Sequence, residues 1–138
     1  MKCQEVMTEN PVFCLPDDSV GQAARVMRRE HVGSVPVVTD DQRRELIGIL
    51  TDHDLAVKIV GESRDANRTN VYDVMTRAVI ACRDDDDVSS AVLAMEEHQI
   101  RRVPIVDYSG QLIGIISHGD VSPSLSPASI VHTLSRAA

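Results

Sequence analysis

The apolar positions of this chain follow a helical spacing in some stretches and form short strand-like runs in others. Two stretches have the i, i+3, i+4, i+7 spacing that is typical of a helix packed against a core. Their members are Val20, Ala23, Ala24 and Met27 in the first and Val88, Ala91, Val92 and Met95 in the second. After each helix come two apolar runs joined by a polar turn, at 35–38 and 46–50 and again at 103–106 and 112–116. This pattern predicts a β-hairpin behind each helix.

The two halves of the chain repeat one another in sequence. Residues 6–38 align with residues 74–106 at a constant offset of 68, and 12 of the 33 aligned positions are identical. After a difference of two residues in the hairpin turn, the apolar strand at 46–49 returns at 112–115. The chain is therefore a tandem duplication, and both copies are expected to have the same fold.

The remaining elements are predicted from shorter patterns. Each copy starts with a short helical lead-in, at 2–8 and 71–76, with Asn70 as the cap of the second. A brief strand follows, at 12–15 and 79–82, and an acidic cluster precedes each amphipathic helix. The acidic residues are most simply helix caps that also compensate the helix dipole. The predicted class is α+β, with a β-α-β-β-α order in each copy.

The boundaries of the copies follow from the polar stretches and the helix stops. A helix begins after Thr51 and is expected to end near Gly61. The predicted organisation is a first repeat at 1–61, a polar linker at 62–70, a second repeat at 71–122 and a helical tail at 123–138. Pro123 shortens the last helix of the second repeat, and a final helix is expected from Ser126 and Pro127.

One motif occurs at the same place in both repeats and indicates a binding function. It reads Gly-Ile-Leu-Thr-Asp-His-Asp at 48–54 and Gly-Ile-Ile-Ser-His-Gly-Asp at 114–120. A hydroxyl at the start of a helix, Thr51 or Ser117, is well placed to contact a phosphate. An aspartate three residues later, Asp54 or Asp120, can accept hydrogen bonds from both hydroxyls of a ribose. The alternative is that these residues only cap the helices.

Composition narrows the classes of partner. The formal charge of −7 and the scarcity of aromatic residues argue against a nucleic-acid binder. No apolar run is long enough for a membrane span, and residues 1–15 lack a signal-peptide pattern. Three cysteines without a CxxC motif fit reduced thiols better than a disulfide framework. A soluble, cytoplasmic protein is expected.

Each half resembles a CBS domain, and the whole chain resembles a CBS pair, or Bateman module. The resemblance rests on the Val-Met-Thr lead-ins, the Val-Pro strands and the Gly-x-x-(Thr/Ser)-x-x-Asp turns, which occur in order in both halves. Residues 95–104 and the short chain further resemble stand-alone bacterial CBS pairs of the mycobacterial hypoxic response type. The family implies two clefts between the repeats that bind AMP, ADP, ATP or S-adenosylmethionine as a regulatory ligand. It implies a homodimer and no catalytic cofactor.

The resemblance also implies a role for individual residues. Asp54 and Asp120 would bind the ribose, and Thr51 and Ser117 would contact phosphate. The residues that would frame the adenine are Val12, Val35 and Pro36 in one copy and Ile80, Val103 and Pro104 in the other. Because Gly33 and Ser34 are replaced by Arg101 and Arg102 in the second copy, only that copy offers guanidinium groups. The site with Arg102 is therefore expected to be the stronger one for an anionic nucleotide.

Two other functions stay open at this stage. The first is a structural, dimeric CBS pair that acts through an unidentified protein partner without a nucleotide. The second is a metal-binding stress protein, since five histidines supply potential ligands, although their spacing matches no metal motif: His31, His53, His98, His118 and His132. An enzyme is not expected, because no nucleophile has a base beside it.

Overall fold

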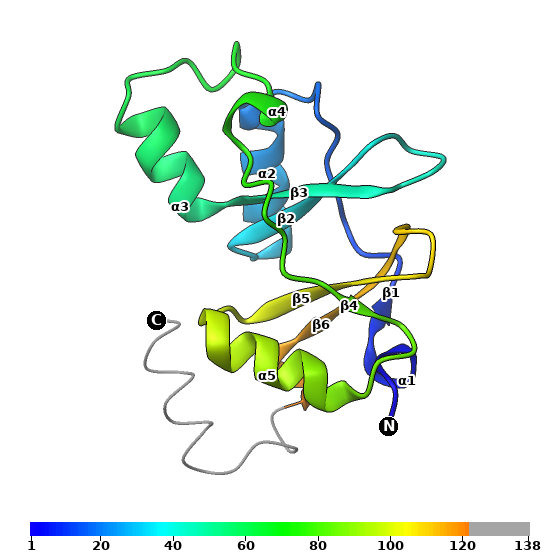
Figure 1. Cartoon of the computed structure of the whole chain (residues 1–138). Coiled ribbons are helices and arrows are strands. Elements are labelled where there is room, and N and C mark those ends of the chain that lie inside the picture. The colour runs from blue at the N-terminus through cyan, green and yellow to red at the C-terminus, as the bar shows by residue number, and fades with distance from the viewer. Residues whose placement is uncertain (122–138) are drawn as a thin grey trace. The chain divides into compact units, whose positions relative to one another are not determined.

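The structure, a computed structural model, describes residues 1–121 and is mixed α+β, as the sequence predicts (Figure 1). In chain order the elements are α1 (Cys3–Val6), β1 (Thr8–Glu9), α2 (Val20–Glu30), β2 (Ser34–Val38), β3 (Leu46–Thr51), α3 (Asp52–Asp54), the π-helical η1 (Leu55–Val60), α4 (Val71–Val74), β4 (Cys82–Arg83), α5 (Val88–His98), β5 (Arg102–Val106), β6 (Leu112–Ser117) and α6 (His118–Val121). The chain divides into two compact units. The first-repeat unit is Val12–Val79, and the second-repeat unit is Met1–Pro11 together with the chain from Ile80 onward.

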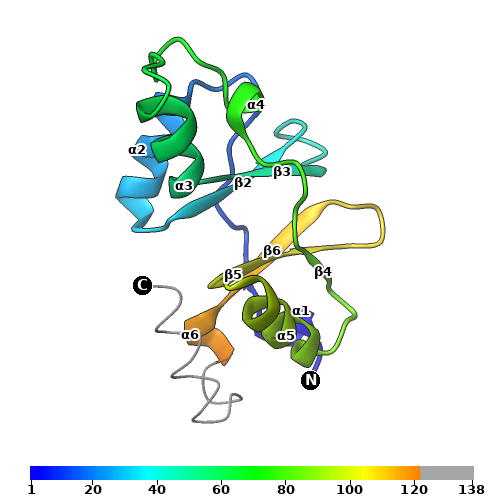
Figure 2. The same ribbon diagram turned by 60° about the vertical axis from the view of Figure 1, so that its left-hand side comes forward.

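The first-repeat unit is built on the antiparallel β2–β3 hairpin. Figure 2 shows α2, α3 and α4 on the same side of this hairpin. The helix α2 begins with a capping box, because Ser19 Oγ accepts from Gln22 N at 3.1 Å while Gln22 Oε1 accepts from Ser19 N at 2.8 Å. Its predicted apolar stripe faces the core, where Val20, Ala23 and Met27 are buried.

The second-repeat unit contains a sheet in the order β1-β6-β5-β4. β5 and β6 form the predicted hairpin, and β4 adds to it in parallel. The helix α5 packs on β5, and its residues Ala91 and Met95 are buried in the core of this unit (Figure 1). The acidic run before α5 acts as the predicted cap, since Asp87 Oδ2 accepts from Ser89 N at 3.0 Å.

The two lead-ins pack on the opposite repeat from their own. Residues 1–11 belong to the second-repeat unit, where β1 pairs with β6 and Cys3 enters the core. Residues 71–79 belong to the first-repeat unit, where Val71, Val74 and Met75 enter the core. The repeated sequence Val-Met-Thr therefore packs across the strand that ends in the Thr or Ser turn. Each spatial unit needs a segment from the other repeat to complete its core.

The repeated glycine of the turn motif makes room for this packing. A Cβ at Gly48 would lie 2.6 Å from Met75 Sδ and 3.1 Å from the carbonyl oxygen of Thr76. A Cβ at Gly114 would overlap the side chain of Met7 in the same way. Glycine at these two positions lets a methionine from the lead-in lie directly on the strand.

Several local predictions differ from the structure. The lead-in helix predicted at 2–8 ends at Val6 because the chain then extends into β1. The strand predicted at 12–15 is reduced to one parallel bridge between Cys14 and Val37, and the one at 79–82 is found at Cys82–Arg83. Asn70 lies at the N-cap of α4, but its side chain makes no capping hydrogen bond.

The helix after β3 ends at Val60 with Gly61 as its C-cap, as predicted. Gly61 has φ −63°, so the helix does not end in the left-handed conformation that favours glycine. The linker covers the start of α2, because Val20 N donates to Thr69 O at 2.8 Å and Gly21 N donates to Ala66 O at 2.9 Å. The shortening at Pro123 and the final helix predicted from Ser126 lie outside the described residues.

Candidate functional site

The turn between β3 and α3 brings the two candidate polar residues of the first repeat into direct contact. Thr51 N and Thr51 Oγ1 each donate to Asp54 Oδ2 at 3.0 Å, and Asp54 N donates to Thr51 Oγ1 at 3.1 Å. This reciprocal pairing is a capping box in which Asp54 takes the place of the usual Glu or Gln. The hydroxyl and the carboxylate that the sequence assigns to phosphate and ribose bind each other here.

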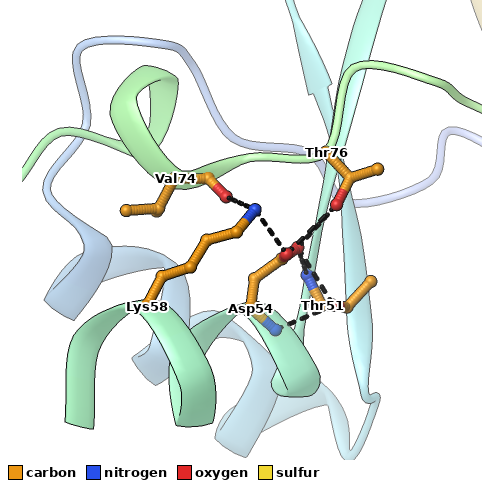
Figure 3. A network of polar contacts seen from close by, with 5 residues as sticks. All are labelled: Thr51, Asp54, Lys58, Val74 and Thr76. Carbon is orange, nitrogen blue, oxygen red and sulfur yellow. Dashed lines mark hydrogen bonds and ion pairs between the residues drawn. The ribbon is translucent and has the colours of Figure 1, made fainter. Parts of the chain in front are cut away.

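Two further residues contact the carboxylate of Asp54 and help to enclose it (Figure 3). Thr76 Oγ1 lies 3.1 Å from Oδ1 and 3.2 Å from Oδ2, and Lys58 Nζ lies 3.0 Å from Oδ1. Lys58 Nζ also donates to the carbonyl oxygen of Val74 at 2.9 Å. Asp54 is only 3% exposed as a result. The network joins the helical turn after β3 to the lead-in of the second repeat.

The electrostatics of Asp54 follow from this network. Burial acts to raise its pKa, but the ammonium of Lys58 and the hydrogen bonds from Thr51 and Thr76 outweigh burial, so that the pKa lies below its ordinary value. Asp54 is therefore a paired, ionised carboxylate at neutral pH.

The equivalent turn of the second repeat is open. Ser117 N and Ser117 Oγ donate to Asp120 Oδ2 at 2.8 Å and 3.0 Å. Asp120 is exposed, and within residues 1–121 only Ser117 hydrogen-bonds to its carboxylate. Thr8, the counterpart of Thr76, pairs through its backbone with Ile115 and its side chain is exposed. The same motif thus gives one enclosed and one accessible carboxylate.

The residues before the Val-Pro strands also distinguish the two turns. Arg102 is the ladder partner of Ser117, whereas Ser34 is the ladder partner of Thr51. The guanidinium of Arg102 is therefore carried by the strand directly beside the hydroxyl that is the candidate phosphate contact. Positive charge next to the Ser117 turn favours an anion there.

The residues next to this pair of ladder positions also differ in charge between the two repeats. The backbone N–H that opens the helix donates to Gly33 O at 2.8 Å in the first repeat and to Arg101 O at 2.7 Å in the second. In the first repeat that N–H belongs to Asp52, whose carboxylate lies 2.9 Å from where a Cβ on Gly33 would be. The first turn therefore combines Asp52 with Gly33, whereas the second combines His118 with Arg101.

The structure groups the predicted site residues by repeat. The first-repeat unit holds Val12, Val35, Pro36, Thr51 and Asp54, and the second-repeat unit holds Ile80, Arg102, Val103, Pro104, Ser117 and Asp120. Val35 and Val103 are 0% exposed, and their side chains pack in the core. Pro36 and Pro104 are buried beside them, while Val12 and Ile80 are half-buried. Contact of these residues with an adenine stays a prediction.

Sequence reasoning missed Thr76 as a member of this site. The repeat of Val-Met-Thr at 6–8 and 74–76 was visible, but nothing in it shows which strand the threonine reaches. The backbone of Thr76 forms a bridge with Ile49, through hydrogen bonds of 2.9 Å and 2.8 Å, and this bridge brings its hydroxyl to Asp54. The ion pair between Lys58 and Asp54 is likewise not indicated by any pattern in the sequence.

The cysteines have the environment of core residues. Cys3, Cys14 and Cys82 are free and buried. Burial, with a smaller contribution from nearby acidic groups, raises the pKa of Cys3 to about 11 and that of Cys14 to about 12. These thiols carry little thiolate at neutral pH and are poor nucleophiles.

Both repeats of the sequence match the same family profile. The family profile described as CBS domain matches residues 3–61 and residues 71–126. The chain belongs to the CBS domain family. The resemblance seen in the sequence is confirmed, and the two matched segments make the chain a CBS pair.

Curated relatives include other CBS proteins of similar length. This CBS pair is 34% identical to the CBS domain-containing protein YhcV of Bacillus subtilis over 86% of this chain and 81% of the relative. It is 30% identical to hypoxic response protein 1 of Mycobacterium tuberculosis over 87% of this chain and 82% of the relative. The chain spans 59% of the length of another relative, MK0525 of Methanopyrus kandleri, with 35% identity over 85% of this chain.

Solved structures of CBS proteins share the fold. A structure of hypoxic response protein I with two coordinated zinc ions has a TM-score of 0.79 and 25% identity, covering 91% of this chain and 100% of that one. A structure of CBSX2 in complex with AMP has a TM-score of 0.75 and 28% identity, covering 89% and 94%. The CBS pair of MJ0100 in complex with 5′-methylthioadenosine and S-adenosyl-L-methionine has a TM-score of 0.73 and 26% identity, covering 90% and 94%.

Two other findings concern the described part of the chain. None of its helices has both the length and the apolar character needed to cross a lipid bilayer. Within residues 1–121, no three histidine, cysteine or acidic side chains gather closely enough to hold a metal ion.

Proposed function

We propose that this protein is a stand-alone regulatory CBS pair that senses an adenosine-containing ligand, such as AMP, ADP, ATP or S-adenosylmethionine. It performs no catalysis, and its output is the response of the pair to occupancy. The ligand binds in the clefts that the family forms between repeats, and the protein works in the cytoplasm. Such a sensor requires that the ligand favours one arrangement of the protein over another.

The observation that carries the proposal is the open turn of the second repeat. Asp120 presents an exposed carboxylate that can accept from the two hydroxyls of a ribose. Ser117 adds a hydroxyl, and its ladder partner Arg102 adds a cation for a phosphate. Together they supply the polar groups that an adenosine nucleotide needs.

Two similar proteins support the class of ligand. CBSX2 was solved with AMP, and the CBS pair of MJ0100 was solved with 5′-methylthioadenosine and S-adenosyl-L-methionine. Both ligand sets contain an adenine and a ribose but differ in charge. Arg102 favours the anionic ligand, so AMP, ADP or ATP is proposed ahead of S-adenosylmethionine.

Isothermal titration calorimetry tests the proposal. Wild-type protein is titrated with AMP, ATP and S-adenosylmethionine, and Asp120→Asn and Arg102→Gln are titrated in parallel. We expect saturable binding that falls about tenfold or more in Asp120→Asn, because a ribose loses a charged acceptor. Arg102→Gln is expected to weaken AMP and ATP more than S-adenosylmethionine. Absence of heat and of any thermal shift with all three ligands would refute the proposal.

A second candidate function is a dimer that serves as a binding platform without a nucleotide. It is favoured by Val57 and Val60 on η1, which are 48% and 77% exposed, and by Leu93 on α5, which is 53% exposed. Val57 and Val60 lie three residues apart on one helix, and exposed apolar side chains of this kind suit a protein interface. We propose that a second copy of the chain covers them, and that a dimer persists whether or not a nucleotide is bound.

A further inference from the structure

The two Asp turns have the same motif but do not offer the same carboxylate. Asp54 is 3% exposed, whereas Asp120 is exposed. The turns themselves are alike, because Thr51 and Ser117 each donate a backbone N–H and a hydroxyl to the following aspartate. The difference must therefore come from outside the motif.

Lys58 is one of the two residues that make the difference. Its Nζ lies 3.0 Å from Asp54 Oδ1 and 2.9 Å from the carbonyl oxygen of Val74, so two acceptors hold the same ammonium. Thr76 supplies the other contact, with Oγ1 at 3.1 Å and 3.2 Å from the two carboxylate oxygens. At the offset of 66 that aligns the two turns, Ser124 replaces Lys58 in the second repeat. Only the first repeat has a lysine at this position.

The acceptor capacity of Asp54 is used within the protein. A carboxylate has about four lone-pair sites. Thr51 N and Thr51 Oγ1 bind Oδ2, Lys58 binds Oδ1, and Thr76 Oγ1 lies between the two oxygens. A ribose diol needs two acceptor sites, so it reaches this carboxylate only by displacing both Lys58 and Thr76. Displacement leaves a buried charge without its partner, which is costly.

We propose that Lys58 is a specificity-determining residue that closes the first repeat to the ribose, so that the chain binds one adenosine ligand, at the Ser117–Asp120 turn. The inference rests on the proposed function. In this proposal Asp54 has a structural role, because it binds the lead-in at 71–79 to the first-repeat unit. Asp120 is the aspartate that binds the ligand. Lys58, which already has two acceptors, does not serve as a phosphate contact.

Calorimetric stoichiometry with AMP tests the proposal. Wild-type protein is expected to bind one AMP per chain. Asp54→Asn is expected to change the affinity by no more than about twofold, since it lies outside the occupied site. Asp120→Asn is expected to lose about tenfold or more.

Removal of Lys58 together with the Thr76 hydroxyl gives the second arm of the test. Lys58→Met/Thr76→Val in the Asp120→Asn background is expected to recover binding of one AMP, now through Asp54. Lys58→Arg/Thr76→Val in the same background keeps a cation beside Asp54 and is the matched control, expected to recover nothing. Circular dichroism and thermal unfolding of each variant confirm that it is folded before titration.

The outcomes separate the two claims. Two AMP molecules per wild-type chain, with one lost in Asp54→Asn, would overturn the closure by Lys58 and leave the proposed function standing. A folded Lys58→Met/Thr76→Val/Asp120→Asn variant without recovered binding would also overturn it. If wild-type protein binds none of AMP, ATP and S-adenosylmethionine, the proposed function fails and this inference fails with it.

Discussion

The internal repeat allows a matched test of the contact between Thr76 and Asp54. Thr76→Val removes the hydroxyl and keeps the shape of the side chain. Thr8→Val makes the same change at the equivalent position of the other lead-in, where the side chain is exposed. Any effect of valine on the backbone of an extended segment is common to both variants. The difference between their free energies of unfolding therefore measures the contribution of the hydrogen bond from Thr76 to Asp54.

The size of the effect follows from the geometry. A hydrogen bond to a charged acceptor contributes about 1.5–3 kcal/mol. Thr76 is only half-buried, and Thr51 and Lys58 still bind the carboxylate in the variant, so we expect a loss at or somewhat below the lower end of this range, about 1–2 kcal/mol. Thr8→Val is expected to change the free energy of unfolding by less than about 0.5 kcal/mol.

The pH dependence identifies the carboxylate as the partner. The pKa of Asp54 is lowered in the folded protein, so its stabilising effect is present above the unfolded pKa of about 3.9 and is lost as the pH falls through the folded value. The difference between wild type and Thr76→Val should therefore be constant near neutral pH and shrink below about pH 4. Urea unfolding followed by circular dichroism at several pH values measures it. Equal losses for Thr76→Val and Thr8→Val, or a difference that persists at acid pH, would refute the reasoning.

Three further predictions follow from packing and exposure. Gly48→Ala is expected to destabilise the protein by about 1–3 kcal/mol, because its Cβ would meet Met75 and the backbone of Thr76, and urea unfolding measures this against wild type. Cys14 is expected to react with Ellman's reagent only on unfolding, since it is buried and its pKa is raised to about 12, and rapid reaction under native conditions would contradict this. Val60→Glu is expected to shift the protein from dimer to monomer in sedimentation velocity, because its side chain is 77% exposed and a charge there opposes burial, and an unchanged dimer would exclude this surface as the interface.

The elements that are best predicted from the sequence are those that bury one face against a single core. Burial of one face places apolar residues at a regular spacing, and this spacing is visible in the sequence of α2 and of the two hairpins. The short strands near Cys14 and Cys82 were predicted less well. Their residues are apolar, but pairing depends on which neighbour they meet, and Cys14 meets β2 at a single position.

The exchange of lead-ins was not predictable from periodicity. Val71, Val74 and Met75 form an apolar face in sequence, but periodicity does not state which core that face enters. The glycine of each turn motif indicates where the lead-in packs. Gly48 and Gly114 lie mid-strand without any need for a positive φ, which indicates close approach by another group. The methionine of the lead-in is that group in both units.

The candidate site shows why a repeated motif does not imply a repeated function. Thr51 and Asp54 reproduce the local geometry of Ser117 and Asp120, so the motif fixes the turn. Access to the carboxylate depends on one residue a helical turn away and on another brought in by the lead-in. The same lead-in that completes the core of the first repeat supplies the hydroxyl that closes its aspartate. Folding of the first-repeat unit and accessibility of the Asp54 carboxylate are therefore coupled through residues 74–76, and a ligand that reached Asp54 would have to loosen that segment from the core.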